Sequence, residues 1–140
     1  MEVAVVRPLF VGAVWPAIKD YVLAACEMTG GRRTPTRVLA EAMDGITILW
    51  VAYDDEQEVK AFATTRICQY DAVTLLCVEM AGGEDLDSWA TPENFDVFIK
   101  FAQDNGCSGI EIHGRGNAWA RKLKQQGWEN FSNAVELRWD

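Results

Sequence analysis

Three apolar segments separated by short polar turns constrain the fold of this chain more than any other feature. Residues 46–53 are apolar at nearly every position, and residues 59–68 and 73–80 follow after short polar connections. Apolar runs of this length, bounded by turn residues, are typical of buried strands. Because such short connections join antiparallel neighbours, the sequence predicts an antiparallel meander of three strands.

The segments on either side of this meander alternate between strand and helix patterns. Residues 2–6 predict a short strand, and Pro16 is placed as if near the start of a helix. The Thr-Pro pairs at 34–35 and 91–92 each predict a helix that begins with a threonine cap and a first-turn proline. The helix after 91–92 has one apolar stripe and ends at the Asn-Gly pair 105–106.

A strand, a crossover helix and a second strand imply one parallel strand pair. We therefore expect residues 109–113 to lie parallel to residues 73–80. Further elements are expected near the C-terminus: a helix over 117–126, a strand over 134–139 and a possible short strand over 128–131. The prediction is an α/β fold of the α+β type, with residues 1–140 as one domain. Its mostly antiparallel central sheet has six or seven strands with one parallel pair, and about four helices cover it.

The charge balance argues against two classes of partner. The chain has a net charge of −8, from 13 basic and 21 acidic residues. A protein this acidic is a poor default binder of nucleic acid or of anionic membranes. The charge is uneven, since residues 84–96 are rich in acids and residues 115–124 are rich in bases.

The cysteines and the N-terminus bear on metal binding and location. The four cysteines form no C-x-x-C pair and the chain has one histidine, so cysteine spacing predicts no metal site. Scattered cysteines with apolar neighbours are typical of a reducing cytosol. The uncharged run over residues 8–18 is too short to span a bilayer, and no signal-peptide pattern precedes it. We therefore expect a cytoplasmic protein that binds no membrane.

Two motifs carry a resemblance to a known family. Leu76-Cys77-Val78 fits an L-x-V pattern on the fourth strand, and Asn117, Ala120 and Leu123 fit an N-x-x-A-x-x-L pattern on the last helix. These patterns and the element order resemble the GNAT family of N-acetyltransferases. The closing segment also resembles small GNAT-like proteins of tailed bacteriophages, at Gly106-Cys107, Ile110-Glu111-Ile112, Gly114-Arg115, Trp119-Ala120-Arg121 and Gly127-Trp128.

The resemblance implies a site for acetyl-CoA between the two parallel strands. In the family, the sheet opens there and the cofactor passes through the gap. By resemblance, the backbone of Val78 and Met80 would contact the pantetheine arm. Gly82 and Gly83 would lie at the entrance of the loop that binds the pyrophosphate, where helix-start N–H groups form an anion site.

Three residues of the basic segment are further candidates for cofactor binding. Arg115 and Arg121 could meet phosphates, or they could form a solvated helix face that pairs with the acidic segment. Asn117 could be a ligand, a helix N-cap or both.

The sequence departs from the family pattern at two places. The family loop reads Q/R-x-x-G-x-G/A, whereas residues 82–89 read Gly-Gly-Glu-Asp-Leu-Asp-Ser-Trp. Three carboxylates therefore stand where two phosphates would bind, and like charges ~4 Å apart repel by about 1 kcal/mol even in water. Lys124 occupies the position at which many members have a tyrosine as general acid.

Two residues are candidates for proton transfer. Glu79, near the end of the strand that lines the expected gap, could be a general base, or a carboxylate exposed at a strand end. His113 lies at the end of the parallel strand, where open α/β sheets place their ligands. It could act in acid–base chemistry, or it could be a surface histidine.

Two functions of different classes follow. The first is acetyl-CoA-dependent transfer to a primary amine, and the acidic rim would favour a small cationic amine such as a polyamine or a lysine side chain. The second is a catalytically silent GNAT-fold protein that binds a protein partner, as a bacteriophage virion or host-interaction component. A gap filled by Leu86, Trp89 or Trp119 would favour the second, and an oligomer is compatible with either.

Overall fold

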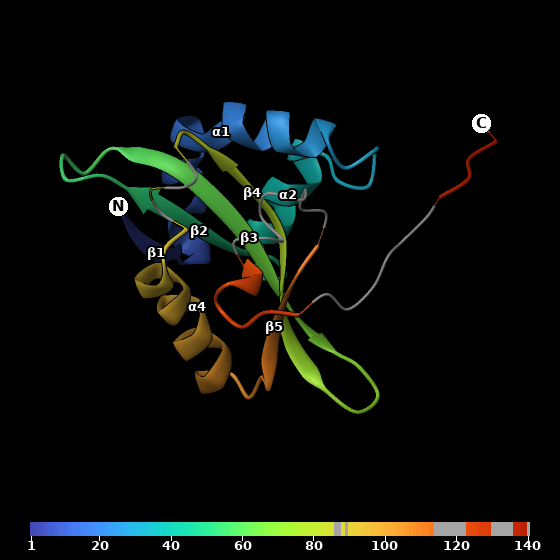
Figure 1. The fold of residues 1–140 in the computed structure, drawn as a ribbon. Helices are drawn as coiled ribbons and strands as arrows, with labels where there is room; N and C mark the ends of the chain where they lie inside the picture. Colours follow the sequence, from blue (N-terminus) through green and yellow to red (C-terminus); the bar gives the residue numbers. More distant parts are fainter. Residues whose placement is uncertain (86–87, 89, 114–122, 130–135, 140) are drawn as a thin grey trace.

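A single sheet of five strands organises the part of the chain that the computed structural model describes, residues 1–85, 88, 90–113, 123–129 and 136–139. The strands are β1 (Glu2–Val6), β2 (Ile48–Tyr53), β3 (Val59–Gln69), β4 (Thr74–Gly83) and β5 (Gly109–Ile112). They lie side by side in chain order, as Figure 1 shows. Neighbours from β1 to β4 are antiparallel and β4–β5 is parallel. The predicted meander, the parallel pair and the mixed fold class are confirmed.

Helices cover both faces of the sheet (Figure 1). On one face lie α1 (Val11–Glu27), which follows a 3-10 turn at Pro8–Phe10, and α2 (Pro35–Met43). On the other face lies α4 (Pro92–Asp104), the crossover helix between β4 and β5. Most of the expected helix over 117–126 lies outside the described residues.

Each face has its own apolar core. Under α4, Trp50 packs against Phe98 with ring centroids 4.4 Å apart, and its indole N–H donates to Thr65 Oγ1 at 2.9 Å. Under α1 and α2, the fully buried Ile18 and Phe62 belong to a second cluster. A buried side chain of this size contributes roughly 1.5–3 kcal/mol, so the two layers hold the sheet from both sides.

The Thr-Pro pairs begin helices as predicted. Thr34 Oγ1 accepts a hydrogen bond from Arg37 N at 3.4 Å at the start of α2. Thr91 Oγ1 accepts one from Asn94 N at 3.3 Å at the start of α4. Both caps satisfy a backbone N–H that has no partner inside its helix.

Pro16 lies inside α1 rather than near its start, so that expectation is wrong. The helix already begins at Val11. A proline inside a helix removes one backbone hydrogen bond at a cost of about 3 kcal/mol. Burial of one complete face against the sheet offsets this cost, through Val11, Ile18, Val22 and Cys26.

The segment 8–27 also has the length and apolar composition of a membrane-crossing helix. Core helices meet the same criterion, and here the buried face of α1 packs on β3 and β4.

The end of β4 differs from the sequence prediction. Residues 81–83 were expected in a loop, yet they continue the strand and pair with β3, as in Ala61↔Gly83. Gly83 has φ +129, and a Cβ there would lie 2.4 Å from Ala61 Cα. The glycine that looks like a strand breaker is therefore what lets the two backbones approach.

The expected C-terminal strand over 134–139 does not join the sheet in its described part, residues 136–139. Leu137 and Trp139 are 82% and 90% exposed. Glu136 pairs instead with Arg32 at 2.8 Å. The described sheet thus has five strands, fewer than the six or seven expected.

Candidate functional site

The two parallel strands are paired over only part of β4. The register runs from Leu75↔Gly109 to Val78↔Ile112, and the last backbone bond joins His113 N to Val78 O at 3.2 Å. Beyond Val78, β4 continues to Gly83 beside β3. The carboxyl end of a parallel pair is where open α/β sheets bind ligands, so this point is the candidate site.

A β-bulge lies at the same point. Thr65 pairs with Val78 and Thr64 pairs with Met80, which leaves Glu79 as the extra residue of β4. A bulge bends its strand and redirects a side chain, and bulges are common beside active sites. The bulge therefore lies directly after Val78, the last β4 residue that pairs with β5 in the described part of the chain.

The backbone candidates Val78 and Met80 flank the bulge. Val78 O is the acceptor for His113 N. The Met80 side chain is 3% exposed and lies in the core under α1, where Cys26 Sγ approaches its sulfur at 3.9 Å. Only the main chain of Met80 is thus suited to the contact that the resemblance implies.

Glu79 belongs to an ion-pair network, which we call the arginine–glutamate cluster: Arg33, Glu41, Arg66 and Glu79. Arg66 Nε donates to Glu79 Oε1 at 3.3 Å, and Arg66 Nη2 donates to both oxygens of Glu41 at 2.9 and 3.0 Å. Arg33 Nη1 donates to Glu41 at 2.6 Å. The carboxylate proposed as a base from the sequence is therefore already paired on one oxygen.

Glu41, on α2, is the centre of this cluster. Its side chain is 8% exposed. Burial acts to raise the pKa of Glu41, but the hydrogen bonds and charges of Arg33 and Arg66 outweigh burial and hold that pKa below its ordinary value. For Arg66, burial is likewise outweighed, and Glu79 and Glu41 raise its pKa. The formal charges of the two arginines and the two glutamates therefore cancel within the network.

His113 flanks the same point from the β5 side. Its side chain is 59% exposed, and its Nε2 lies 3.1 Å from Glu111 Oε1. The structure thus places Glu79 and His113 on neighbouring strands near the end of their pairing, but gives each its own partner, Arg66 and Glu111 respectively. His113 is reachable from solvent, as a proton donor must be.

At the position expected for the phosphate loop, the structure has the end of strand β4 followed by two acidic residues. Gly82 and Gly83 belong to β4, and their lack of a side chain is explained by contact with β3 and α1. Beyond them, Glu84 N donates to Lys60 O at 2.7 Å. The Lys60 ammonium lies 3.1 Å from Glu58 and 3.7 Å from Glu84, so this cation is already paired.

Several predicted residues lie outside the described part of the chain. These are the cofactor candidates Arg115, Asn117 and Arg121, and the gap-filling candidates Leu86, Trp89 and Trp119. Nearby described residues agree with the expected packing of the last helix. Leu123 is buried in the core under α4, and Trp128 packs on Phe95 with centroids 5.7 Å apart.

Arg66 and Glu41 are the site residues that the sequence analysis missed. Arg66 interrupts the apolar and β-branched run of residues 61–68 in β3, and a charged residue in such a run needs a partner. That signal was available, but its partner on α2 lies 25 positions away and has no sequence signature. The Tyr70 hydroxyl also reaches this part of the sheet and donates to Glu111.

The chain is similar to known proteins in its structure but matches no sequence family. No family model and no curated protein matches the chain. A solved structure described as a probable acetyltransferase covers 100% of this chain and 99% of its own, at 12% identity and a TM-score of 0.70.

Two further solved structures cover nearly the whole chain. The ribosomal-protein-alanine N-acetyltransferase of Brucella melitensis biovar Abortus 2308 is 14% identical, covers 99% of this chain and 100% of its own, and has a TM-score of 0.67. An aminoglycoside N-acetyltransferase in complex with CoA is 14% identical, covers 98% and 93%, and has a TM-score of 0.63. Identities this low establish the fold alone. This chain has a GNAT-like fold.

Proposed function

We propose that this protein is an acetyl-CoA-dependent N-acetyltransferase of the GNAT type that acts on a primary amine. One observation carries the proposal: within a GNAT-like fold, β4 and β5 stop pairing at Val78 and Ile112, next to the bulge at Glu79. The similarity to solved acetyltransferases, one of them in complex with CoA, supports the proposal. The expected location is the cytoplasm.

The described residues fit one part of acetyl-CoA. The backbone of Met80, beyond the β5 pairing, suits the amide-bearing pantetheine arm, and we propose the same contact for Val78, whose carbonyl in this structure accepts from His113 N. After Gly83, the exposed Glu84 and Asp85 oppose phosphates. We assign the phosphates to Arg115 and Arg121, with Asn117 at the helix start that the sequence predicts.

The chain's own residues supply proton transfer and orientation. The bound cofactor supplies an activated acetyl thioester. Glu79 would take a proton from the acceptor ammonium at its carboxylate, directly or through a water. His113, or a water, would deliver a proton to the departing thiolate.

The acceptor is expected to be a small cationic amine. Glu84 and Asp85 are exposed at the end of β4, and the chain has a net charge of −8. Such a rim attracts cations and raises their rate of encounter at low salt. A polyamine or a lysine side chain fits this description.

A second candidate function is binding without transfer. It is favoured by the same acids, because Glu84 occupies the loop entrance and Lys60 is already paired with it. On this reading the fold presents a rigid surface to a protein partner.

Calorimetric titration of acetyl-CoA at low and moderate salt separates the two. We expect one saturable site per chain, weakened at least tenfold by Arg115→Ala or Arg121→Ala and unchanged by the control Arg7→Ala, an exposed arginine next to β1. Spermidine and a lysine peptide are then tested for release of free CoA thiol. Absence of binding at millimolar acetyl-CoA would reject the enzyme, and binding without thiol release would favour the second function.

A further inference from the structure

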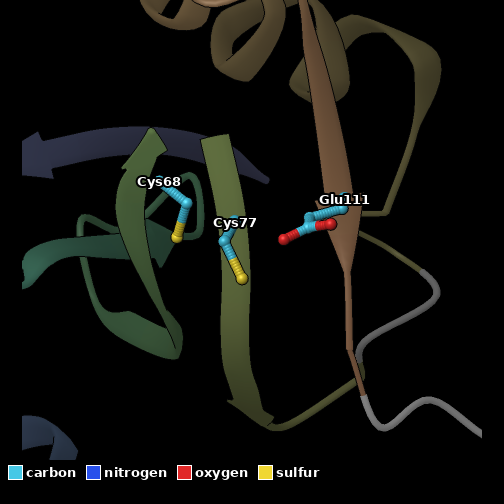
Figure 2. Close-up of side chains that lie close together, drawn as sticks. All are labelled: Cys68, Cys77 and Glu111. Atoms are coloured by element: carbon cyan, nitrogen blue, oxygen red, sulfur yellow. The ribbon is translucent and has the colours of Figure 1, made fainter. Parts of the chain in front are cut away.

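We propose that Cys68, Cys77 and Glu111 form a Zn²⁺ site, with His113 as the fourth ligand. The three side chains come from three adjacent strands, β3, β4 and β5, and gather on one side of the sheet (Figure 2). Their two sulfur atoms and a carboxylate oxygen all lie within 4.8 Å of one another. We call Cys68, Cys77 and Glu111 the thiol–carboxylate cluster.

Sheet register explains why these residues meet. Cys77 and Glu111 are direct partners in the parallel pair, so their side chains share a face. Cys77 is also the partner of Arg66, and Cys68 lies two positions further along β3, on the same face and diagonal to Cys77. The register thus fixes all three on rigid elements.

The spacing of the three ligand atoms is close to what zinc requires. Zinc bonds of ~2.3 Å to sulfur and ~2.0 Å to oxygen place tetrahedral ligand atoms roughly 3.5–3.8 Å apart. Side-chain rotations that bring the atoms together by about 1 Å therefore suffice. Figure 2 shows the Glu111 carboxylate directed across the sheet toward Cys77.

The donor types select a borderline transition metal. Thiolates favour Zn²⁺ over Mg²⁺ or Ca²⁺, which prefer sets composed of oxygen atoms alone. Binding would release the two thiol protons to solvent and leave two thiolates and a carboxylate around the cation. The nearest arginine, Arg66, is already paired with Glu41 and Glu79, so it does not serve this cluster.

One neighbour of Glu111 orients it as the outer partner of a metal ligand does, and a second neighbour is close enough to be a ligand itself. The Tyr70 hydroxyl donates to Glu111 Oε1. His113 Nε2 lies 3.1 Å from the same oxygen, close to the roughly 3.3 Å that separates nitrogen and oxygen ligands on one tetrahedral zinc. His113 is exposed and free to rotate toward the metal, so it is the natural fourth ligand.

A metal ion at this position would bridge three strands near the end of the β4–β5 pairing. β5 is only four residues long and lies at the edge of the described sheet. A zinc ion would pin β5 to β3 and β4, which is a structural role. With His113 engaged as its ligand, a water rather than His113 would deliver the proton to the departing thiolate in the acetyl transfer proposed above.

The test is titration of the reduced full-length protein with Co²⁺, a spectroscopic substitute for zinc, followed by displacement with Zn²⁺. We expect one equivalent to produce a thiolate-to-cobalt charge-transfer band and visible bands of tetrahedral intensity, both removed by Zn²⁺. Cys68→Ser and Cys77→Ser should each lose at least half of the charge-transfer intensity. The matched control Cys107→Ser, a buried cysteine outside the cluster, should keep it.

Two further variants test the remaining ligands without removing a thiol. Glu111→Gln and His113→Ala should each weaken Co²⁺ binding at least tenfold, and Tyr70→Phe about tenfold through loss of an outer partner. Circular dichroism of every variant confirms that it folds. The proposal is overturned if the reduced wild-type protein gives no charge-transfer band, or if the band persists in both Cys68→Ser and Cys77→Ser.

Discussion

The arginine–glutamate cluster and the thiol–carboxylate cluster lie on the same face of the sheet but balance their charges differently. The first contains two arginines and two glutamates joined by direct ion pairs. In the second, burial together with Glu111 and Cys68 raises the pKa of Cys77. The first cluster is neutralised by its own ion pairs, whereas the second contains no cationic side chain among its three members and its Cys77 thiol favours the protonated form.

The difference follows from what burial costs. An unpaired buried charge is expensive, so a protein either pairs it or leaves the group neutral. Glu41 takes the first course and stays charged between Arg33 and Arg66. The buried Cys77 thiol takes the second course and stays neutral. The geometry of its cluster with Cys68 and Glu111 makes that cluster a candidate for metal binding, whereas the arginine–glutamate cluster is a candidate for stability.

Removing the central charge of the arginine–glutamate cluster should have the largest effect. Glu41→Gln leaves Arg33 without its carboxylate partner in this cluster and Arg66 with Glu79 alone, and breaking a buried pair this way costs about 3 kcal/mol of unfolding free energy. Urea unfolding measures the loss. The control Glu56→Gln, in an exposed turn, should change the unfolding free energy by less than about 0.5 kcal/mol. Equal effects of the two variants would remove the contrast between the clusters.

Zinc should produce the next largest effect. If the thiol–carboxylate cluster binds Zn²⁺, free metal at 100 times its dissociation constant adds about 2.7 kcal/mol to the unfolding free energy. For a chain of 140 residues this raises the melting temperature by roughly 10 °C. Differential scanning calorimetry should show the rise in wild type and in Cys107→Ser but not in Cys77→Ser. A rise that is equal in all three proteins would assign it to other sites.

The fold was predictable where local signals agreed, and the two clusters were not. The Thr-Pro pairs at 34–35 and 91–92, the short turns of the meander and the crossover over 92–104 each specify structure locally. Pro16 and the end of β4 were misplaced, because packing against the sheet overrides the preference of single residues.

The polar clusters depend on contacts between residues far apart in the chain. Cys68 and Cys77 are nine positions apart on two strands, and Glu111 comes from a third. Rules for metal sites look for cysteines a few positions apart and cannot detect such a set. The bacteriophage resemblance and the roles of Arg115, Asn117 and Arg121 remain predictions.

Lowering the pH should weaken the stabilisation that the arginine–glutamate cluster contributes to folding. The folded-state pKa of Glu41 lies below the unfolded one, so its stabilisation is complete above the ordinary value of 4.5 and is lost as pH falls through the lowered folded-state value. The unfolding free energy, measured by urea at pH 7 to pH 3, should therefore fall less steeply in Glu41→Gln than in wild type. Parallel curves would mean that Glu41 gains no stabilisation from its arginines.

The smallest effect on folding is expected for Glu79, the outer member of the arginine–glutamate cluster. Arg66 keeps both hydrogen bonds to Glu41 when Glu79 is replaced, and its side chain is 34% exposed to solvent, which screens the remaining charge. Glu79→Gln should thus lower the unfolding free energy by less than about 1 kcal/mol. General-base catalysis contributes about 10²–10⁴-fold, so the same variant should lose at least 100-fold in acetyl transfer to spermidine. A variant that retains both stability and transfer would show that the bulge at Glu79 only shapes the strand, and the base would then have to be a water held near the end of the β4–β5 pairing.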